Sequence, residues 1–224
     1  MEKSELRSSL ALAGIFALRM LGLFLILPVF SIHAKSLSGG DQALLVGLAL
    51  GIYGFVQACL HIPLGMLSDK YGRRPVVVLG LALFVLGAFI AASHDDLVWI
   101  TTGRAIQGAG AISAAVTAWL ADLTREETRT RAMAMVGGSI ALTFALSLVV
   151  ASPLHQSIGL DGMFNVMAFL GIGALLIALF VVPEQSKSSQ TPFTAKFSEV
   201  FFNKDLFRLN VGVLVLHAAQ IALF

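Results

Sequence analysis

The chain has 224 residues, of which 57% are hydrophobic and 12% are charged, against roughly 25% charged residues in an ordinary soluble domain. So few polar groups cannot cover a water-exposed surface, which excludes a soluble globular protein and predicts an integral membrane protein. The net charge of +2 is too small to indicate a nucleic-acid partner. The single cysteine, Cys59, excludes an internal disulfide and a cysteine metal cluster, and its apolar neighbours predict a buried, unreactive thiol.

Seven apolar segments approach or exceed the roughly 20 residues that a helix needs to cross a bilayer. The first is longer than a signal peptide, contains Arg19 and lacks a small-residue cleavage site, which favours a retained span. The last has no C-terminal flank, so we expect a seventh span that is cut short. The segments are residues 10–30, 44–67, 76–92, 97–121, 132–154, 163–182 and 209–224.

Pro183 ends the sixth span, so the sequence predicts a six-helix transmembrane bundle over residues 1–183. We expect a cytoplasmic linker over residues 184–205 and the start of a seventh transmembrane helix over residues 206–224. Within the linker, four apolar residues recur at helical spacing, which favours a short amphipathic helix on the membrane surface over an irregular loop. These four residues are Phe193, Phe197, Val200 and Phe201.

Lysine and arginine are distributed unequally between the two sets of loops. Of the 15 basic residues, two lie inside spans (Arg19 and Arg104), only Lys35 flanks one set of span ends, and the other 12 flank the opposite set. Cytoplasmic loops are enriched in Lys and Arg, so we expect the N-terminus and the loops after even-numbered spans to be cytoplasmic. The 12 residues are Lys3, Arg7, Lys70, Arg73, Arg74, Arg125, Arg129, Arg131, Lys187, Lys196, Lys204 and Arg208.

Polar side chains are also spread unequally over the spans. The second and fifth spans each carry a polar stripe at helical spacing, whereas the third and sixth are almost purely apolar. This order is expected of a three-plus-three repeat whose third helix faces lipid. The stripe in the second span favours a water-filled cavity, and the Ser/Thr stripe fits bonding to the helix backbone equally well. The stripes are Tyr53, Gln57 and His61, and Ser139, Thr143 and Ser147.

Charged groups inside the spans are few. No carboxylate lies within a complete span, so His61 and the arginines are the only candidates for proton coupling, with a structural histidine as the alternative for His61. An arginine in hydrocarbon is costly, so Arg104 must face protein or water, unless it extends to the outer surface.

The loop between the second and third spans combines two glycines, one acid and three bases at the membrane face. The glycines allow a tight turn and close helix approach, whereas an ordinary basic loop would need only the bases. This pattern closely resembles motif A of the major facilitator superfamily. Its residues here are Gly65, Asp69, Lys70, Gly72, Arg73 and Arg74.

The fourth and fifth spans also bear on this resemblance. Arg104, Gln107 and Gly108 resemble motif B of the same superfamily. In the family's antiporters, motif C ends the fifth helix with a Gly-Pro pair preceded by spaced glycines. Here Ser152 precedes Pro153, and the spaced glycines are mostly absent after Gly137 and Gly138. That departure puts antiport, as opposed to other coupling, in doubt.

The first span narrows the resemblance further. Its Leu-Gly pair at residues 21–22 and Pro-Val pair at residues 28–29 resemble the motif of twelve-helix drug:proton antiporters, although Ser31 replaces the family's last proline. Together with motif A, residues 18–22 and 123–126 resemble transporters of the YajR type.

The resemblance covers the whole chain. It implies an all-α integral membrane fold, the six-helix N-terminal bundle of a major facilitator superfamily transporter, built as a 3+3 inverted repeat and truncated in helix seven. The resemblance implies that motif A latches the outward-open state from the cytoplasmic side. Carried over by position, Asp69, Arg73 and Asp122 would form its charge cluster.

The implied function is secondary transport of small organic compounds, as proton-coupled efflux by alternating access, and not an enzyme activity. A truncated, non-transporting remnant and uptake or uniport of a small metabolite are the alternatives. Expected partners are the lipid bilayer, a small-molecule substrate, protons and the missing C-terminal half, without a cofactor, in a bacterial inner membrane. The candidates for the cavity or proton coupling are Arg19, Tyr53, Gln57, His61, Arg104, Gln107, Gly108 and Ser139. Of these, we expect all but Gln107 and Gly108 to point toward the concave side of the bundle, away from the third and sixth spans.

Overall fold

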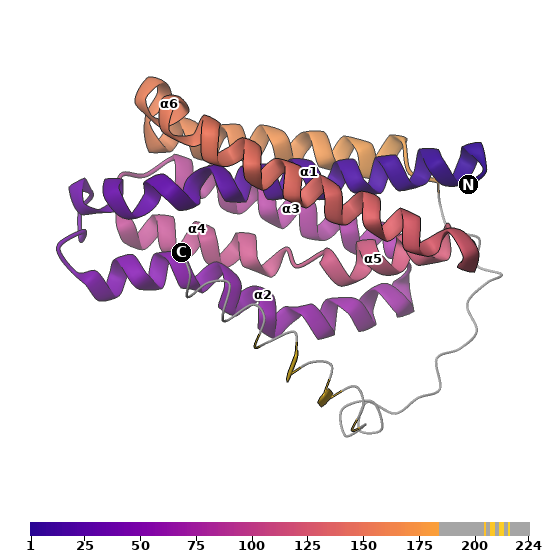
Figure 1. Cartoon of the computed structure of the whole chain (residues 1–224). Coiled ribbons are helices and arrows are strands. Elements are labelled where there is room, and N and C mark those ends of the chain that lie inside the picture. Colours follow the sequence, from indigo (N-terminus) through magenta and orange to yellow (C-terminus); the bar gives the residue numbers. More distant parts are fainter. Residues whose placement is uncertain (184–203, 205–206, 209–210, 213–214, 216–224) are drawn as a thin grey trace. The chain divides into compact units, whose positions relative to one another are not determined.

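In the computed structural model, the chain is helical over most of the residues that it describes (Figure 1). These are residues 1–183, 204, 207–208, 211–212 and 215, without the side chains of residues 31, 32 and 35. The chain divides into two units, Met1–Gln185 and Ser186–Phe224, and the first contains every helix discussed below. The expected amphipathic helix and most of the seventh span lie outside the described residues. The helices are α1 (Lys3–His33), α2 (Ala43–Tyr71), α3 (Arg73–Ala92), α4 (Leu97–Ala109), α5 (Ser113–Asp122) and α6 (Glu126–Phe180), with a short turn η1 (Ala34–Ser36) after α1.

Helices α1, α2, α3 and α6 are long and apolar enough to cross a membrane. Helix α6 has 55 residues, and at 1.5 Å per residue it would extend about 80 Å if straight, more than twice the thickness of a hydrocarbon core. Its backbone leaves helical geometry at Gly159. Figure 1 shows α6 crossing the bundle, turning at its far end and returning. Helix α6 therefore contains both the fifth and the sixth predicted spans.

The predicted fourth span is interrupted, which corrects the expectation of one continuous segment. Helix α4 ends at Ala109 and α5 begins at Ser113. Gly110 leaves helical geometry between them, with ψ 38°, and its carbonyl oxygen accepts a hydrogen bond of 3.2 Å from Arg19. Neither helix is long enough to cross a bilayer alone, so the two together make one pass.

The helices pack around two apolar clusters. Helix α1 packs along α6, α3 packs against α4 and α6, and α2 packs mainly against α4 (Figure 1). One cluster contains Leu12, Val77 and Trp119, and the other contains Phe30 and Phe84. Because each cluster draws side chains from several helices, the apolar surfaces predicted from the sequence are partly used for packing between helices.

The sequence predicted that the third and sixth spans face lipid, but both also pack against other helices. Helix α3 buries Leu81 and Phe84, and the returning part of α6 buries Phe164. Helix α2 is instead the least buried of the four long helices, and its Cys59 is exposed rather than buried. Lipid tails are as apolar as leucine, so the lack of polar side chains cannot distinguish contact with lipid from contact with another helix.

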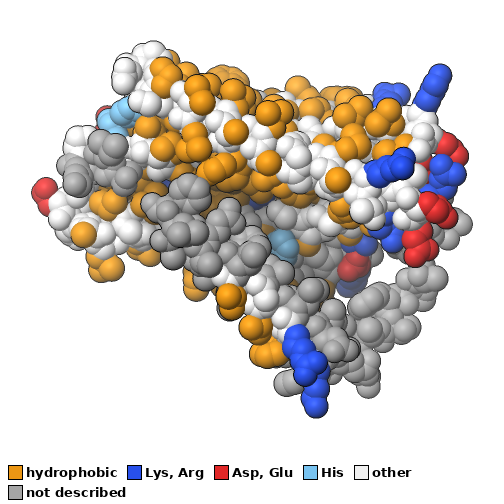
Figure 2. Space-filling model, viewed as in Figure 1, with side chains coloured by type: hydrophobic (Ala, Val, Ile, Leu, Met, Phe, Trp, Pro, Cys, Tyr) orange, Lys and Arg blue, Asp and Glu red, His pale blue; other side chains and the backbone are white. Residues whose placement is uncertain are grey.

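Charged side chains gather at one end of the first unit, on the right in Figure 2, whereas hydrophobic side chains cover its middle. We call this end, which holds the N-terminus, the charged end. It contains the ion pairs of Arg73 with Asp122 and of Arg125 with Glu2.

Candidate functional site at the charged end and inside the bundle

The motif A residues lie at a junction of two helices and not in a loop, which corrects the sequence analysis. Helix α2 continues to Tyr71 and α3 begins at Arg73, so Gly72 alone connects them. Gly72 has φ 99°, a left-handed angle that residues with a side chain rarely adopt. This short connection brings Asp69, in the last turn of α2, beside the first turn of α3.

Arg73 joins three helices at the charged end. Its Nε donates a hydrogen bond of 3.0 Å to Asp122 Oδ2 on α5, and its Nη1 forms an ion pair with Asp69 on α2. Nη1 also donates to the hydroxyl of the fully buried Ser68 at 2.8 Å. Asp122 ends α5, where the helix dipole disfavours a negative charge, and the guanidinium offsets that cost. The expected approach of Arg73 to both carboxylates is therefore present. We call Asp69, Arg73 and Asp122 the latch.

The other motif A residues have different neighbours. Lys70 lies over the ring of Tyr71, with its Nζ 5.3 Å from the ring centroid. Arg74 hydrogen-bonds the carbonyl oxygen of Leu179 on α6. A Cβ added to Gly65 would lie 3.6 Å from the Cβ of Ala114, so α2 and α5 approach closely at this level.

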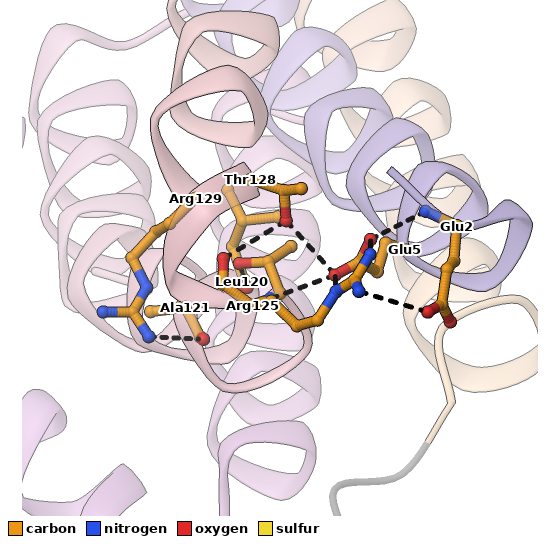
Figure 3. Close-up of polar contacts among 8 residues, drawn as sticks. Glu2, Glu5, Leu120, Ala121, Arg125, Thr128 and Arg129 are labelled. Atoms are coloured by element: carbon orange, nitrogen blue, oxygen red, sulfur yellow. Dashed lines mark hydrogen bonds and ion pairs between the residues drawn. The ribbon is translucent and has the colours of Figure 1, made fainter.

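A second charged network at this end, which was not predicted from the sequence, links α1 to the start of α6 (Figure 3). The carboxylate of Glu5 accepts hydrogen bonds from Arg125 Nε at 3.0 Å and Arg125 Nη2 at 3.2 Å. The hydrogen bonds and charge of Glu5 raise the pKa of Arg125 above its ordinary value. The Glu-x-x-Glu spacing of Glu2 and Glu5 indicates a cap at the start of a helix, but it does not predict a contact with Arg125.

Arg19 lies inside the bundle with an exposed fraction of 0%. Its Nη2 donates hydrogen bonds to the hydroxyl of Tyr53 at 2.8 Å, to Gln57 Oε1 at 3.4 Å and to the carbonyl of Gly110 at 3.2 Å. Its guanidinium also lies 5.5 Å from the ring centroid of Phe84 on α3. The expected orientation of Arg19 away from the third span is therefore wrong, because the arginine fills the space between α1, α2, α3 and the α4–α5 break.

Arg104 is buried in the same way, with an exposed fraction of 1%. It donates hydrogen bonds to the carbonyl oxygens of Ala49 at 2.7 Å and Leu50 at 3.5 Å, both on α2. Its guanidinium also lies over the rings of Phe30 and Tyr53. Arg104 thus faces protein, as the cost of lipid exposure predicted, but it packs between helices and not along an open cavity.

The remaining candidates for the cavity or for proton coupling lie at buried or half-buried positions. Gln107 is fully buried and its Nε2 donates to Met167 Sδ on α6 at 3.1 Å, so it points toward the sixth span. Gly108 is buried against the backbone of Tyr53, and His61 is half-buried on α2. Ser139 donates to the carbonyl oxygens of Val136 and Ala13.

All three members of the Ser/Thr stripe donate to a carbonyl oxygen of their own helix, and Ser139 also donates to that of Ala13 on α1. Thr143 donates to the carbonyl of Ile140 at 2.9 Å, and Ser147 donates to that of Phe144 at 2.7 Å. The backbone-bonding alternative for this stripe is therefore confirmed.

Comparison with known proteins supports the same family as the motifs. The profile of the Major Facilitator Superfamily matches residues 12–224. The chain is 41% identical to the inner membrane transport protein YajR of Escherichia coli strain K12, over 100% of this chain and 50% of that protein. It is 28% identical to the class C tetracycline resistance protein of Escherichia coli, over 96% of this chain and 54% of that protein.

A solved structure agrees with this fold. The crystal structure of the human organic anion transporter MFSD10 matches with a TM-score of 0.69 and 23% identity, covering 82% of this chain and 49% of that chain. The chain thus spans about half the length of the relatives that it matches. The family profile, the identity over the full chain and the helical architecture together show that this chain belongs to the Major Facilitator Superfamily.

Proposed function

We propose that the chain is the N-terminal bundle of a secondary transporter that exports small organic compounds in exchange for protons, by alternating access. The latch is the observation that carries this proposal. Arg73 ties the ends of α2, α3 and α5 together at the charged end. In a transporter that rocks between two states, contacts made in only one state favour that state. In the proposed cycle, the latch would be the contact that favours one of the two states.

The direction of transport rests on a relative. The class C tetracycline resistance protein is named for a resistance activity, which export of a compound would explain. The sequence Ser152-Pro153 departs from the antiporter pattern at the end of the fifth span, so the exchange for protons needs its own test. Uptake of a metabolite is the alternative outcome of that test.

We further propose that the charged end faces the cytoplasm of a bacterial inner membrane. The unequal distribution of Lys and Arg favours this orientation, and the relative YajR is an inner membrane protein. Residues 184–205 would then be a cytoplasmic linker and residues 206–224 the start of a seventh span. A second, C-terminal bundle would complete the substrate site, which such transporters build where their repeats meet.

The proposal can be tested in inside-out membrane vesicles that contain this chain together with the C-terminal half of YajR. Respiration acidifies the vesicle lumen, which acridine orange reports as quenched fluorescence. Adding an exported compound, such as tetracycline or ethidium, should release protons from the lumen and restore fluorescence, and Asp122→Asn should reduce this response. Vesicles with the C-terminal half alone are the control. Further quenching on substrate addition, or no response to any compound in a broad panel, would contradict proton-coupled efflux.

A further inference from the structure

We infer that Glu5 is a positioning residue for the latch. It holds the turn between α5 and α6, and thereby Asp122, where Arg73 can reach it. The inference rests on the proposed function of the latch. It adds a residue from the first turn of α1, which lies outside motif A.

The carboxylate of Glu5 is surrounded by donors. Its Oε1 accepts from the backbone N–H of Arg125 at 3.1 Å, from Arg125 Nε at 3.0 Å and from the hydroxyl of Thr128 at 3.2 Å. Its Oε2 accepts from the backbone N–H of Glu2 at 2.8 Å and from Arg125 Nη2 at 3.2 Å. The side chain is only 7% exposed, so these donors replace the water that a free carboxylate would bind.

One carboxylate therefore caps the N-termini of two helices. In α1, Glu5 forms a capping box with Glu2, which is a local arrangement. In α6, Arg125 is the N-cap residue, and Glu5 reaches both its backbone N–H and the nearby Thr128. A negative charge is favourable at a helix N-terminus, and here both helix dipoles act on the same group. The first turns of α1 and α6 are thus fixed to each other.

The turn that this contact fixes is the one that carries the latch carboxylate. Only Leu123 and Thr124 separate Asp122 from Arg125. Thr124 is buried and its hydroxyl donates to the carbonyl of Leu120 at 2.7 Å. The turn is therefore short and held from both sides, by Arg73 through Asp122 and by Glu5 through Arg125 (Figure 3 shows the second side).

A purely structural cap would stabilise the helices without changing the latch, so the test needs a reporter of the latch itself. Gly65 of α2 and Ala114 of α5 provide one, because their Cβ atoms would lie 3.6 Å apart, within the range of about 3.5–4.5 Å found in disulfides. The reporter is the 224-residue chain with Gly65→Cys and Ala114→Cys, and with Cys59→Ala to remove the native thiol. It should form this disulfide rapidly under mild oxidation when the latch holds α2 close to α5.

Four substitutions are then compared in this background, in chain purified as a single size-exclusion peak. Asp122→Asn should slow disulfide formation severalfold, because it weakens the latch directly. Glu5→Gln should slow it by a similar factor, because the neutral amide loses the charge that holds Arg125. Arg125→Lys should give an intermediate rate, since it keeps the charge but not the paired hydrogen bonds. Glu2→Gln is the matched control: Glu2 is 66% exposed and forms one ion pair with Arg125, so the rate should not change.

The outcomes separate this inference from the proposed function. If Asp122→Asn slows the reaction but Glu5→Gln and Arg125→Lys do not, the latch exists and Glu5 does not position it. If Asp122→Asn has no effect, the latch itself fails and the inference fails with it. If Glu5→Gln prevents folding, the inference is tested by Arg125→Lys alone. An unchanged rate of disulfide formation in that variant contradicts the inference. The inference would also be contradicted if Glu2→Gln slowed disulfide formation as much as Glu5→Gln does.

Discussion

The Nε atom of Arg104 lies 2.7 Å from the carbonyl oxygen of Ala49, between α4 and α2. Among the described residues, no carboxylate forms an ion pair with this buried arginine. Backbone carbonyls and aromatic rings therefore take the place of a counter-charge, and the arginine holds α2 against α4.

This arrangement predicts that lysine is a worse substitute for Arg104 than methionine. Arg104→Lys keeps a charge that needs more water and cannot reproduce the planar guanidinium, whereas Arg104→Met fills the space without a buried charge. We expect the lysine variant to be less stable than the methionine variant by roughly 1–3 kcal/mol. Tryptophan fluorescence of the purified chain in detergent during heating measures the difference. The same two changes at the exposed Arg131 are the control. If the methionine variant unfolds at a lower temperature than the lysine variant, the positive charge at this position stabilises the fold.

Gly103 is predicted to be intolerant of a side chain. A Cβ at this position would lie 2.5 Å from the carbonyl oxygen of Gly87 on α3 and 2.9 Å from the backbone nitrogen of Ala91. Gly103→Ala should force α3 and α4 apart and destabilise the chain by about 1–3 kcal/mol. Gly137→Ala is the matched control, because nothing lies within 4 Å of its added Cβ and alanine favours helix over glycine. Equal unfolding temperatures for the two variants would argue against this packing.

The proposed orientation predicts a labelling pattern in intact cells. In a Cys59→Ala background, Ser36→Cys should react with a membrane-impermeant maleimide, whereas Thr130→Cys should react only after the membrane is opened. Both positions are exposed in the structure, and Ser68 is unsuitable because it is fully buried. The reverse pattern would mean that the charged end faces outward.

The 224-residue chain by itself is expected not to transport. Alternating access needs two bundles that move against each other around one site, and the chain spans about half the length of its relatives. Purified chain in sealed vesicles should show no saturable uptake or efflux beyond that of empty vesicles, with or without a pH gradient. Saturable transport by this chain alone would show that one bundle suffices, for example as a homodimer.

Several features follow from local sequence and were predicted from it. Composition determines that the chain must lie in a membrane, and the lengths of the apolar runs locate the passes. The latch was also predicted, because the resemblance to motif A implies a charge cluster of Asp69, Arg73 and Asp122, and Asp122 ends a span on the same side of the membrane as Arg73. Even so, the segment around Gly72 was expected to be a loop, since the sequence does not show that one residue suffices to connect α2 and α3.

Only the tertiary structure determined how the helices meet. Glu5 and Arg125 are 120 residues apart, and their contact depends on the packing of α1 against α6. Likewise, the carbonyl of Gly110, freed at the break between α4 and α5, accepts its hydrogen bond from Arg19, 91 residues earlier in the chain. Composition determines whether a segment enters the membrane, because its transfer from water to lipid depends on its own side chains. Which face then meets lipid and which meets protein depends on shape and hydrogen bonding between distant segments, because lipid tails and apolar side chains are chemically alike.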